Sequence, residues 1–308
     1  MRIAVQFGLS FALLLTLCAS AFAGTVADGV KIAFVGDTST SAKFKEVLNL
    51  IKREKADLMI VPGDTDYGSG EAKWDGLIKS VLGDEAALIA LGNHDYTDSN
   101  KDKIVALGMA RLAKNPQIKC TGAYGEKMTC AYRGIYIVLS SIGSGGGTAA
   151  SHEAYIQARL NAAPPEHWRV CTWHKNQREM QVGDKGNEVG WNAYETCREK
   201  GAIIVTGHEH SYARSLLLSN MTLRKIANPA ASPLTVTEGT TFAIVSGLGG
   251  VSAREQLLHS PHWAKIYSAT QSANFGVLFG VFKAKQAHFY MKTIDNKIID
   301  DFIVNKGY

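Results

Sequence analysis

Short apolar segments alternate with helical patterns along this chain, and that alternation constrains its fold more than any other feature. Residues 31–35 and 58–61 are short apolar runs of the kind that form buried strands, and an amphipathic helical spacing lies between them at Phe44, Val47, Leu48 and Ile51. Further strands are expected at 87–91, 135–140, 169–173, 203–206 and 242–246, helices at 74–81 and 191–199, and a strand-rich end at 275–304. Strand and helix in alternation predict a layered α/β sheet.

The composition agrees with a globular domain. The chain has 308 residues, of which 46% are hydrophobic and 20% charged, which is enough to form a full core. There is no internal repeat and no low-complexity linker, so a single domain is expected at 24–308. The net charge of +5 comes from scattered lysines and arginines, and we therefore expect no nucleic-acid partner.

The first residues have the layout of a signal peptide. Met1 and Arg2 precede an apolar run at 7–17, and small residues follow up to Ala21-Phe22-Ala23. The alternative, a membrane anchor, is disfavoured because about 11 apolar residues fall well short of the roughly 20 that span a bilayer. We expect cleavage after 1–23, a secreted or extracytoplasmic protein, and no membrane span. The sequence gives no indication of an oligomeric state.

Four cysteines remain once Cys18 leaves with the signal peptide. An even count in an oxidising compartment suggests two disulfides. Cys120 and Cys130 flank a turn-rich segment and could close a small loop, and Cys171 would then pair with Cys197. Buried free thiols are the alternative, because spacing alone does not fix connectivity.

Polar residues follow the predicted strands at the points where the strands end. These residues, with one tyrosine nearby, are Asp37, Asp64, Tyr67, Asn93, His174, His208 and His210. The carboxyl ends of strands in an open α/β sheet are where ligands bind, so these side chains should converge. Seven oxygen and nitrogen donors suit a pair of hard or borderline cations, whereas a structural zinc site needs four ligands. Two such ions can bind a phosphate and activate water, which predicts phosphoester hydrolysis.

The order of these motifs, G-D, G-D-x-x-Y, G-N-H-D, H and G-H-x-H, resembles the calcineurin-like metallophosphoesterases. The segments 63–67 and 207–214 are similar to the purple acid phosphatase branch, and the resemblance extends over about residues 31–282. It implies a calcineurin-like sandwich of two mixed β-sheets flanked by helices, with a dimetal site at the C-terminal ends of the strands.

The resemblance also implies a role for each candidate. Asp37, Tyr67 and His210 would hold the first ion, a ferric iron in the purple enzymes, with Asp64 bridging to the second. Asn93, His174 and His208 would hold that second, divalent ion, expected to be Fe, Zn or Mn. His94 is the expected catalytic residue, as an acid for the leaving group or a phosphate contact. Tyr67 takes the place of the histidine that many relatives carry after the first aspartate, although it could instead be a packed aromatic.

The sequence departs from the purple pattern on the substrate side. Ser39 stands where a second glycine is common, Lys175-Asn176-Gln177 follows His174, and there is no further histidine near Gly183. We expect an acid phosphatase-like enzyme that hydrolyses small phosphomonoesters with a metal-bound hydroxide. The alternatives are a phosphodiesterase acting on nucleotides or lipids, and a secreted metal-binding protein that has lost turnover.

Overall fold

Two mixed β-sheets face each other in the structure, a computed structural model that describes residues 29–308 apart from 69 and 99. The seven-stranded sheet has the order β12-β17-β16-β15-β1-β2-β3. Its strands are β1 (Val30–Phe34), β2 (Leu58–Val61), β3 (Ala87–Ile89), β12 (Leu234–Val236), β15 (Gly276–Phe282), β16 (Gln286–Thr293) and β17 (Ile298–Lys306). The predicted signal peptide at 1–23 lies outside the described residues and stays a prediction.

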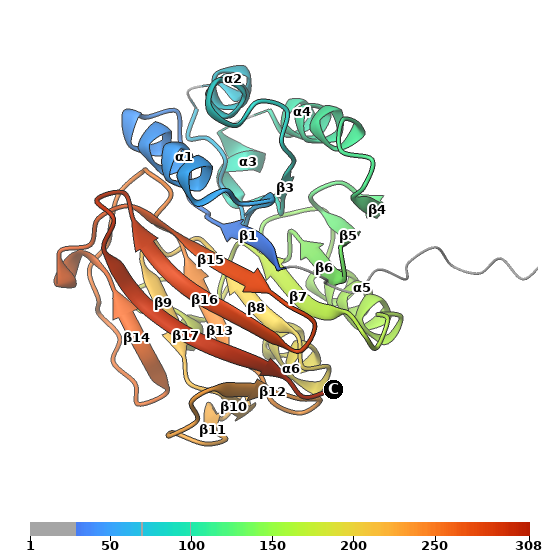
Figure 1. Cartoon of the computed structure of the whole chain (residues 1–308), viewed down its shortest axis with the longest axis vertical. Helices are drawn as coiled ribbons and strands as arrows, with labels where there is room; N and C mark the ends of the chain where they lie inside the picture. The colour runs from blue at the N-terminus through green and yellow to red at the C-terminus, as the bar shows by residue number, and fades with distance from the viewer. Residues whose placement is uncertain (1–28, 69, 99) are drawn as a thin grey trace, which may run out of the picture.

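The second sheet has eight strands in the order β14-β9-β13-β8-β7-β6-β5-β4, and β10 pairs with β11 in a small separate ribbon. Its strands are β4 (Lys119–Ala123), β5 (Lys127–Tyr132), β6 (Ile135–Ser140), β7 (Trp168–Trp173), β8 (Ile203–Thr206), β9 (Tyr212–Ser215), β13 (Ala243–Ser246) and β14 (Trp263–Tyr267). The ribbon consists of β10 (Leu218–Asn220) and β11 (Lys225–Ile226). Figure 1 shows the red strands of the first sheet in front of the green and yellow strands of the second.

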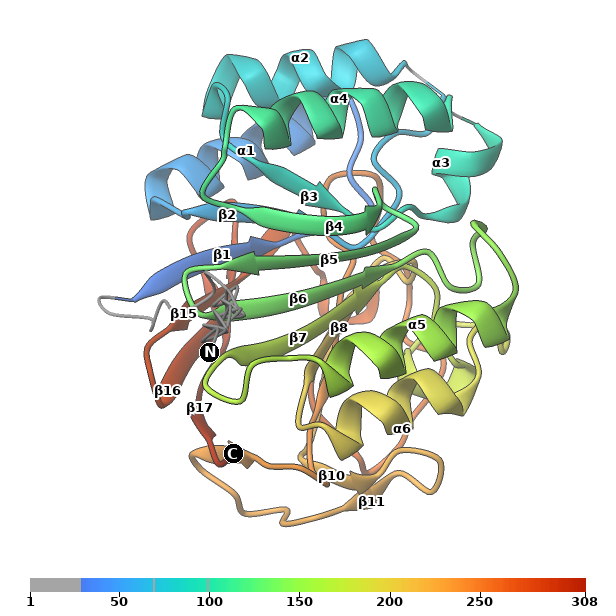
Figure 2. The same cartoon turned by 90° about the vertical axis from the view of Figure 1, so that its right-hand side faces the viewer.

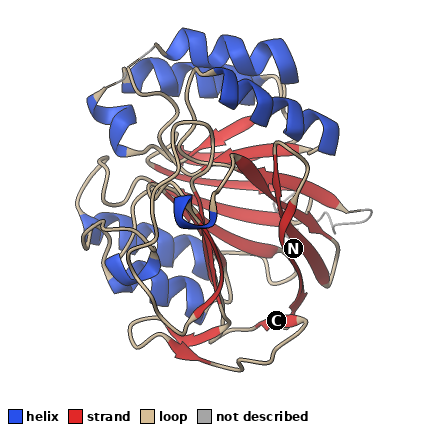
Figure 3. Cartoon of the chain, turned by 90° about the vertical axis from the view of Figure 1, so that its left-hand side faces the viewer, coloured by secondary structure: helices blue, strands red, loops and turns tan. Residues whose placement is uncertain are grey.

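Helices cover the outside of the two sheets in two separate groups (Figures 2 and 3). The first group is α1 (Ala42–Glu54), α2 (Glu71–Leu82), α3 (Asn93–Thr97) and α4 (Lys101–Ala113), and the second is α5 (Ala149–Asn161) and α6 (Trp191–Glu199). Two short 3₁₀ turns lie at Arg178–Met180 and Ala269–Gln271. The predicted sandwich of two mixed sheets flanked by helices is therefore confirmed. Among the described residues, no helix has the length and apolar character needed to cross a bilayer.

Apolar residues point to both faces of the second sheet, and both faces are buried. In β7, Val170 packs into the core between the two sheets, whereas Cys171 and Trp173 point to the opposite face. That opposite face packs against α5 and α6 through residues such as Ile156 and Tyr194. Successive strand residues point to opposite faces, so a continuous apolar run is what a strand covered on both sides requires.

The cysteines behave in two different ways. Cys120 and Cys130 lie directly opposite each other on β4 and β5 and form the first expected disulfide. The second expected disulfide is wrong for this structure, because Cys171 and Cys197 are both buried free thiols. Burial, and then contact with the Cys171 thiol, raise the pKa of Cys197, so the thiol stays protonated and unreactive in its apolar layer.

Candidate metal centre

The carboxyl ends of the parallel strands of both sheets meet at one edge of the sandwich. β1, β2 and β3 run parallel in the first sheet, and β6, β7, β8 and β13 run parallel in the second. Hydrogen bonds join the two sets of strand ends, from Gly36 N to Ser246 O at 2.8 Å and from Ser246 Oγ to Phe34 O at 2.9 Å. The polar residues that follow these strands are thereby brought into one cluster, as the motif order predicts.

Three of the predicted ligands follow their strands in a left-handed backbone conformation. The φ angles of Asp37, Asp64 and His208 are 54°, 53° and 70°. Non-glycine residues rarely adopt this conformation, and where they do the surrounding contacts hold them there. One such contact is the hydrogen bond from His208 N to Asp37 Oδ2 at 2.9 Å, which links the end of β8 to the end of β1.

Two glycines let backbone and side chains approach closely at this edge. Gly63 has a φ of +84°, and a Cβ there would lie 2.4 Å from the His174 ring. A Cβ on Gly92 would lie 2.1 Å from Asp64 Oδ1. No side chain fits at either position without displacing a predicted ligand, which explains the glycine before each motif.

Asp64, His174 and His208 form the first group of candidate ligands, and their donor atoms all lie within 4.8 Å of one another. His174 Nε2 is 3.0 Å from Asp64 Oδ2 and 3.1 Å from His208 Nδ1. All three side chains are buried. The fourth expected member, Asn93, begins α3, whose next residue donates from His94 N to Asp64 Oδ1 at 2.9 Å.

Asp37, Tyr67 and His210 form the second group. The Tyr67 hydroxyl lies 3.3 Å from Asp37 Oδ1 and 3.2 Å from His210 Nε2, and those two atoms are 3.4 Å apart. The same hydroxyl is 3.2 Å from Asp64 Oδ2. Asp64 Oδ2 thus contacts both groups, which is the position that a bridging carboxylate requires.

His94 lies at the mouth of the cluster, with 31% of its side chain exposed. Its ring packs on Tyr67 with centroids 4.3 Å apart, and its Nε2 is 4.0 Å from Asp64 Oδ2. Its Nδ1 is bonded to the Asp98 carboxylate one turn later in the chain. A carboxylate accepts only, so Nδ1 carries a proton, and Nε2 is the atom left to face a ligand.

Burial and close charged neighbours shift the pKa values of the ionisable groups in the cluster. Burial would raise the pKa of Asp64, but the adjacent His174 and His94 together outweigh burial and lower it. Burial would lower the pKa of His174, but Asp64 raises it to about 9. Burial, Asp37 and Asp64 together raise the pKa of the Tyr67 phenol far above its usual range. A bound cation is the kind of neighbour that reverses this last effect.

Several side chains that the sequence did not single out hold the ligands in place. Asp95 is fully buried and accepts hydrogen bonds from Thr65 N and Oγ1, Asp64 N and Gly92 N, so it ties the second motif to the third. Ser252 Oγ is 2.7 Å from His210 Nδ1. Asp95 could have been found from its place in Gly-Asn-His-Asp. Ser252 belongs to none of the motifs, so the sequence gives no indication of its contact with His210.

The donor set fits a pair of metal ions. His174 Nδ1 lies 2.9 Å from the Pro62 carbonyl, which only accepts, so the proton of the neutral ring is on Nδ1 and the lone pair of Nε2 points into the cluster. The buried Oδ1 of Asn93 has no hydrogen-bond partner among the described residues. An unpaired buried amide oxygen and an inward imidazole lone pair are what a cation would satisfy. The ligand roles of the seven residues stay predictions.

Comparison with known protein families gives a match over residues 30–212 to the model of the calcineurin-like phosphoesterases, described as Metallophos. This match covers more than half of the chain. The chain belongs to the calcineurin-like phosphoesterase family. The family implies a dimetal site, and a cluster of possible metal ligands, Asp64, His174 and His208, lies at the edge described above. A comparison with curated protein sequences gives no match.

Solved structures share the fold of this phosphoesterase at low sequence identity. The purple acid phosphatase PPD1 of yellow lupin (Lupinus luteus) superimposes with a TM-score of 0.70 at 14% identity, covering 92% of this chain and 55% of its own. This chain thus spans about half the length of the lupin enzyme. GAP50 of Plasmodium, described as an anchor in the inner membrane complex, has a TM-score of 0.60 at 14% identity, covering 90% and 89%. A dimetal phosphatase of Danio rerio has a TM-score of 0.54 at 9% identity, covering 90% and 98%.

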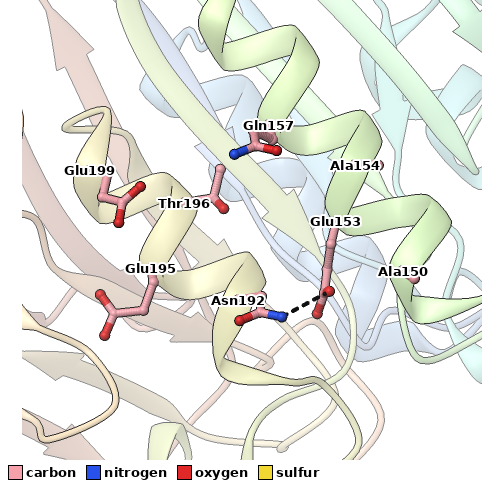
Figure 4. Close-up of a pocket in the computed structure, with 8 residues that line it drawn as sticks. All are labelled: Ala150, Glu153, Ala154, Gln157, Asn192, Glu195, Thr196 and Glu199. Carbon is pink, nitrogen blue, oxygen red and sulfur yellow. Dashed lines mark hydrogen bonds between the residues drawn. The ribbon is translucent and has the colours of Figure 1, made fainter.

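A groove on the surface lies between α5 and α6, away from this centre. Figure 4 shows its polar lining, in which Asn192 Nδ2 donates to Glu153 Oε2 at 3.2 Å. None of the seven predicted ligands lines it. Glu195, on one wall, is already bonded to Arg198 and to the backbone at Met221 and Thr222. The groove therefore has no part in the chemistry of the metal centre.

Proposed function

We propose that this phosphoesterase is a secreted, acid phosphatase-like hydrolase of small phosphomonoesters. The observation that carries the proposal is the place of Asp64 Oδ2, which contacts His174 on one side and Tyr67 on the other. One carboxylate oxygen shared by two donor groups is the arrangement that a two-metal hydrolase needs. Secretion is proposed from the signal-peptide layout of 1–23.

The residues divide into those that would hold metal and one that faces the substrate. Asp37, Tyr67 and His210 would hold the first ion, Asn93, His174 and His208 the second, and Asp64 both; we propose Fe(III) and a divalent ion. When bound, such a pair supplies an activated water and neutralises phosphate charge. His94 lies at the mouth, where its Nε2 can pass a proton to the leaving oxygen or hold a phosphate oxygen.

A role of His94 in proton transfer predicts a leaving-group effect. A positioned acid contributes roughly 10²- to 10⁴-fold to the rate. We expect His94→Ala to keep both ions and to lose rate by that range, most for phosphomonoesters with poor leaving groups. Metal analysis and a series of phenyl phosphates measure this. An equal loss for good and poor leaving groups would leave only phosphate binding for His94.

The substrate class is tested with two chromogenic esters. Protein loaded with iron and zinc should hydrolyse p-nitrophenyl phosphate faster than bis-p-nitrophenyl phosphate. The reverse preference would favour a phosphodiesterase. The likeness to GAP50, which is described as an anchor, makes a binding protein without turnover the other candidate. Tight metal binding without hydrolysis of either ester would favour that candidate and reject the proposed function.

A further inference from the structure

Glu188 lies against the metal centre, although it belongs to none of the strand-end motifs. It sits between the 3₁₀ turn Arg178–Met180 and α6, in the stretch near Gly183 where the sequence carries no further histidine. Its Oε2 lies 2.6 Å from His208 Nε2. Its Oε1 lies 2.5 Å from Lys175 Nζ, so a single carboxylate contacts a predicted ligand and a cation at once.

The stretch that carries Glu188 is fixed to the strand ends. Glu188 N and Val189 N both donate to Asn176 O, at 3.1 and 3.3 Å. Asn176 is buried, and its Nδ2 donates to Gly207 O at 2.7 Å, directly before His208. Gly143 packs against the same stretch, since a Cβ there would lie 2.7 Å from Glu188 O. The Glu188 backbone is thus held by the ends of β7 and β8 themselves.

The contact with Glu188 favours one tautomer of His208. Oε2 and Nε2 are 2.6 Å apart, although their angle lies outside the range of a hydrogen bond, and a carboxylate oxygen at that distance repels a lone pair on Nε2. In the neutral ring the contact therefore favours the proton on Nε2, so that Nδ1 presents its lone pair. His208 Nδ1 is 3.1 Å from His174 Nε2, whose lone pair also points inward because His174 Nδ1 donates to Pro62 O. When both rings are neutral, two lone pairs face each other 3.1 Å apart, and a bound cation would take the place of the proton that Asp64 otherwise holds on His174. That arrangement suits a shared cation.

We propose that Glu188, held by Lys175, is a positioning residue that fixes the tautomer and ring orientation of His208 so that Nδ1 faces the second metal ion. The stretch that lacks the histidine expected from the resemblance supplies a carboxylate in its place. Carboxylate–histidine–metal arrangements of this kind orient the ligand and raise its basicity. The inference rests on the proposed dimetal function, but concerns metal binding and not the identity of the substrate.

The test measures Zn²⁺ binding to metal-free protein by calorimetry and needs no catalytic assay. Loss of such a partner typically lowers metal affinity about 10- to 100-fold. We expect that fall for one of two Zn²⁺ ions in Glu188→Ala, a smaller fall in Glu188→Gln, which keeps an acceptor, and a smaller fall in Lys175→Met. Glu46→Ala is the matched control, because Glu46 also pairs with a lysine, at 3.2 Å, but on the exposed face of α1. It should bind both ions like wild type.

Nitrogen NMR of the histidine rings in wild-type protein tests the tautomer directly and requires no variant to fold. The neutral His208 ring should carry its proton on Nε2, both without metal and with Zn²⁺. A proton on Nδ1 would overturn the proposal, as would wild-type Zn²⁺ affinity in Glu188→Ala. The two proposals fail differently. If wild type hydrolyses no ester while Glu188→Ala still loses Zn²⁺ affinity, only the proposed function falls.

Discussion

At the scale of single residues, the contacts among the seven predicted ligands say more about function than the residue types do. Tyr67 is the clearest case, since its hydroxyl contacts an atom from each of Asp37, Asp64 and His210. A tyrosine that merely packed would turn its hydroxyl towards water or one backbone acceptor. The sequence could suggest Tyr67 from the spacing after Asp64, but only the fold brings His210, 143 residues later, to the same oxygen.

Tyr67→Phe should retain the fold and lose the colour of the iron-loaded protein. The change removes one oxygen and leaves the ring on His94, so we expect the free energy of unfolding of the metal-free form to change by about 1 kcal/mol. A phenolate bound to Fe(III) gives a visible absorption band, by resemblance to the purple enzymes. Absorption spectra of iron-loaded wild type and variant measure it. A wild type that holds iron yet has no tyrosine-dependent band would overturn the purple-branch assignment.

Asp95→Asn should destabilise the metal-free protein although it hardly changes shape. Each Asp95 oxygen accepts two hydrogen bonds, and the amide nitrogen of Asn fits best on the Oδ1 side, where the Thr65 hydroxyl can turn to accept but Thr65 N is left unpaired. An unsatisfied buried donor costs roughly 1–3 kcal/mol, and we expect a loss of that size in urea denaturation. Asp102→Asn makes the same change on the exposed face of α4 and should be neutral. Equal stability of the two variants would contradict this role.

At the scale of elements, strand positions were predictable and the covering helices less so. The runs at 58–61, 135–140 and 203–206 and the helix at 191–199 have the predicted bounds. α4 and α5 were not predicted, since their apolar positions do not form a clear stripe. Each begins after a capping side chain: Asn100 accepts a hydrogen bond from Lys103 N at the start of α4, and Thr148 accepts one from Ser151 N at the start of α5. Each gains its stability from packing on a sheet, which local spacing does not encode.

The contact of α1 with the first sheet predicts a dependence of stability on pH. Glu54 ends α1 and accepts hydrogen bonds from Lys292 Nζ at 2.6 Å, Tyr290 Oη at 2.7 Å and Lys31 Nζ at 3.3 Å. Burial would raise the pKa of Glu54, but these partners outweigh burial and lower it below its usual range. A lowered folded-state pKa adds stability above the unfolded-state pKa, and that stability is lost as pH falls through the folded-state value.

Glu54→Gln should therefore be less stable than wild type at pH 7 by about 1 kcal/mol, because the charge-assisted bonds are weakened. The difference should begin to close as the pH falls through the unfolded-state pKa of a glutamate, about 4.3, and disappear below the lower folded-state pKa, where the wild-type carboxylate is protonated in both states. Urea denaturation across this pH range measures it. Glu46→Gln changes an exposed carboxylate of the same helix and should shift stability by a few tenths of a kcal/mol at most. A difference between wild type and Glu54→Gln that persists unchanged at pH 3 would be inconsistent with this assignment.

At the scale of the whole molecule, the metal centre exists because two sheets end at the same edge. The sequence predicts which residues follow strands, since four of the five motifs are an apolar run, a glycine and a polar residue, and His174 follows its strand directly. It does not predict that β1 and β13 are joined end to end by Gly36 and Ser246. Contacts such as Glu188 with His208 depend on that closure and carry no local pattern. The prediction of a Cys171–Cys197 disulfide was wrong for a related reason. Sequence spacing does not show whether two cysteines remain free thiols buried in an apolar layer.

The central claim, that this edge holds two metal ions for phosphoester hydrolysis, is tested most directly by His174→Ala. Metal content by plasma mass spectrometry and hydrolysis of p-nitrophenyl phosphate are measured on the same preparations. We expect wild type to bind about two ions per chain, and the variant to lose about one of them and all hydrolysis above the uncatalysed rate. His288→Ala, an exposed histidine paired with Asp301 far from the motifs, should match wild type in both. Full metal content in His174→Ala together with unchanged hydrolysis would contradict the account.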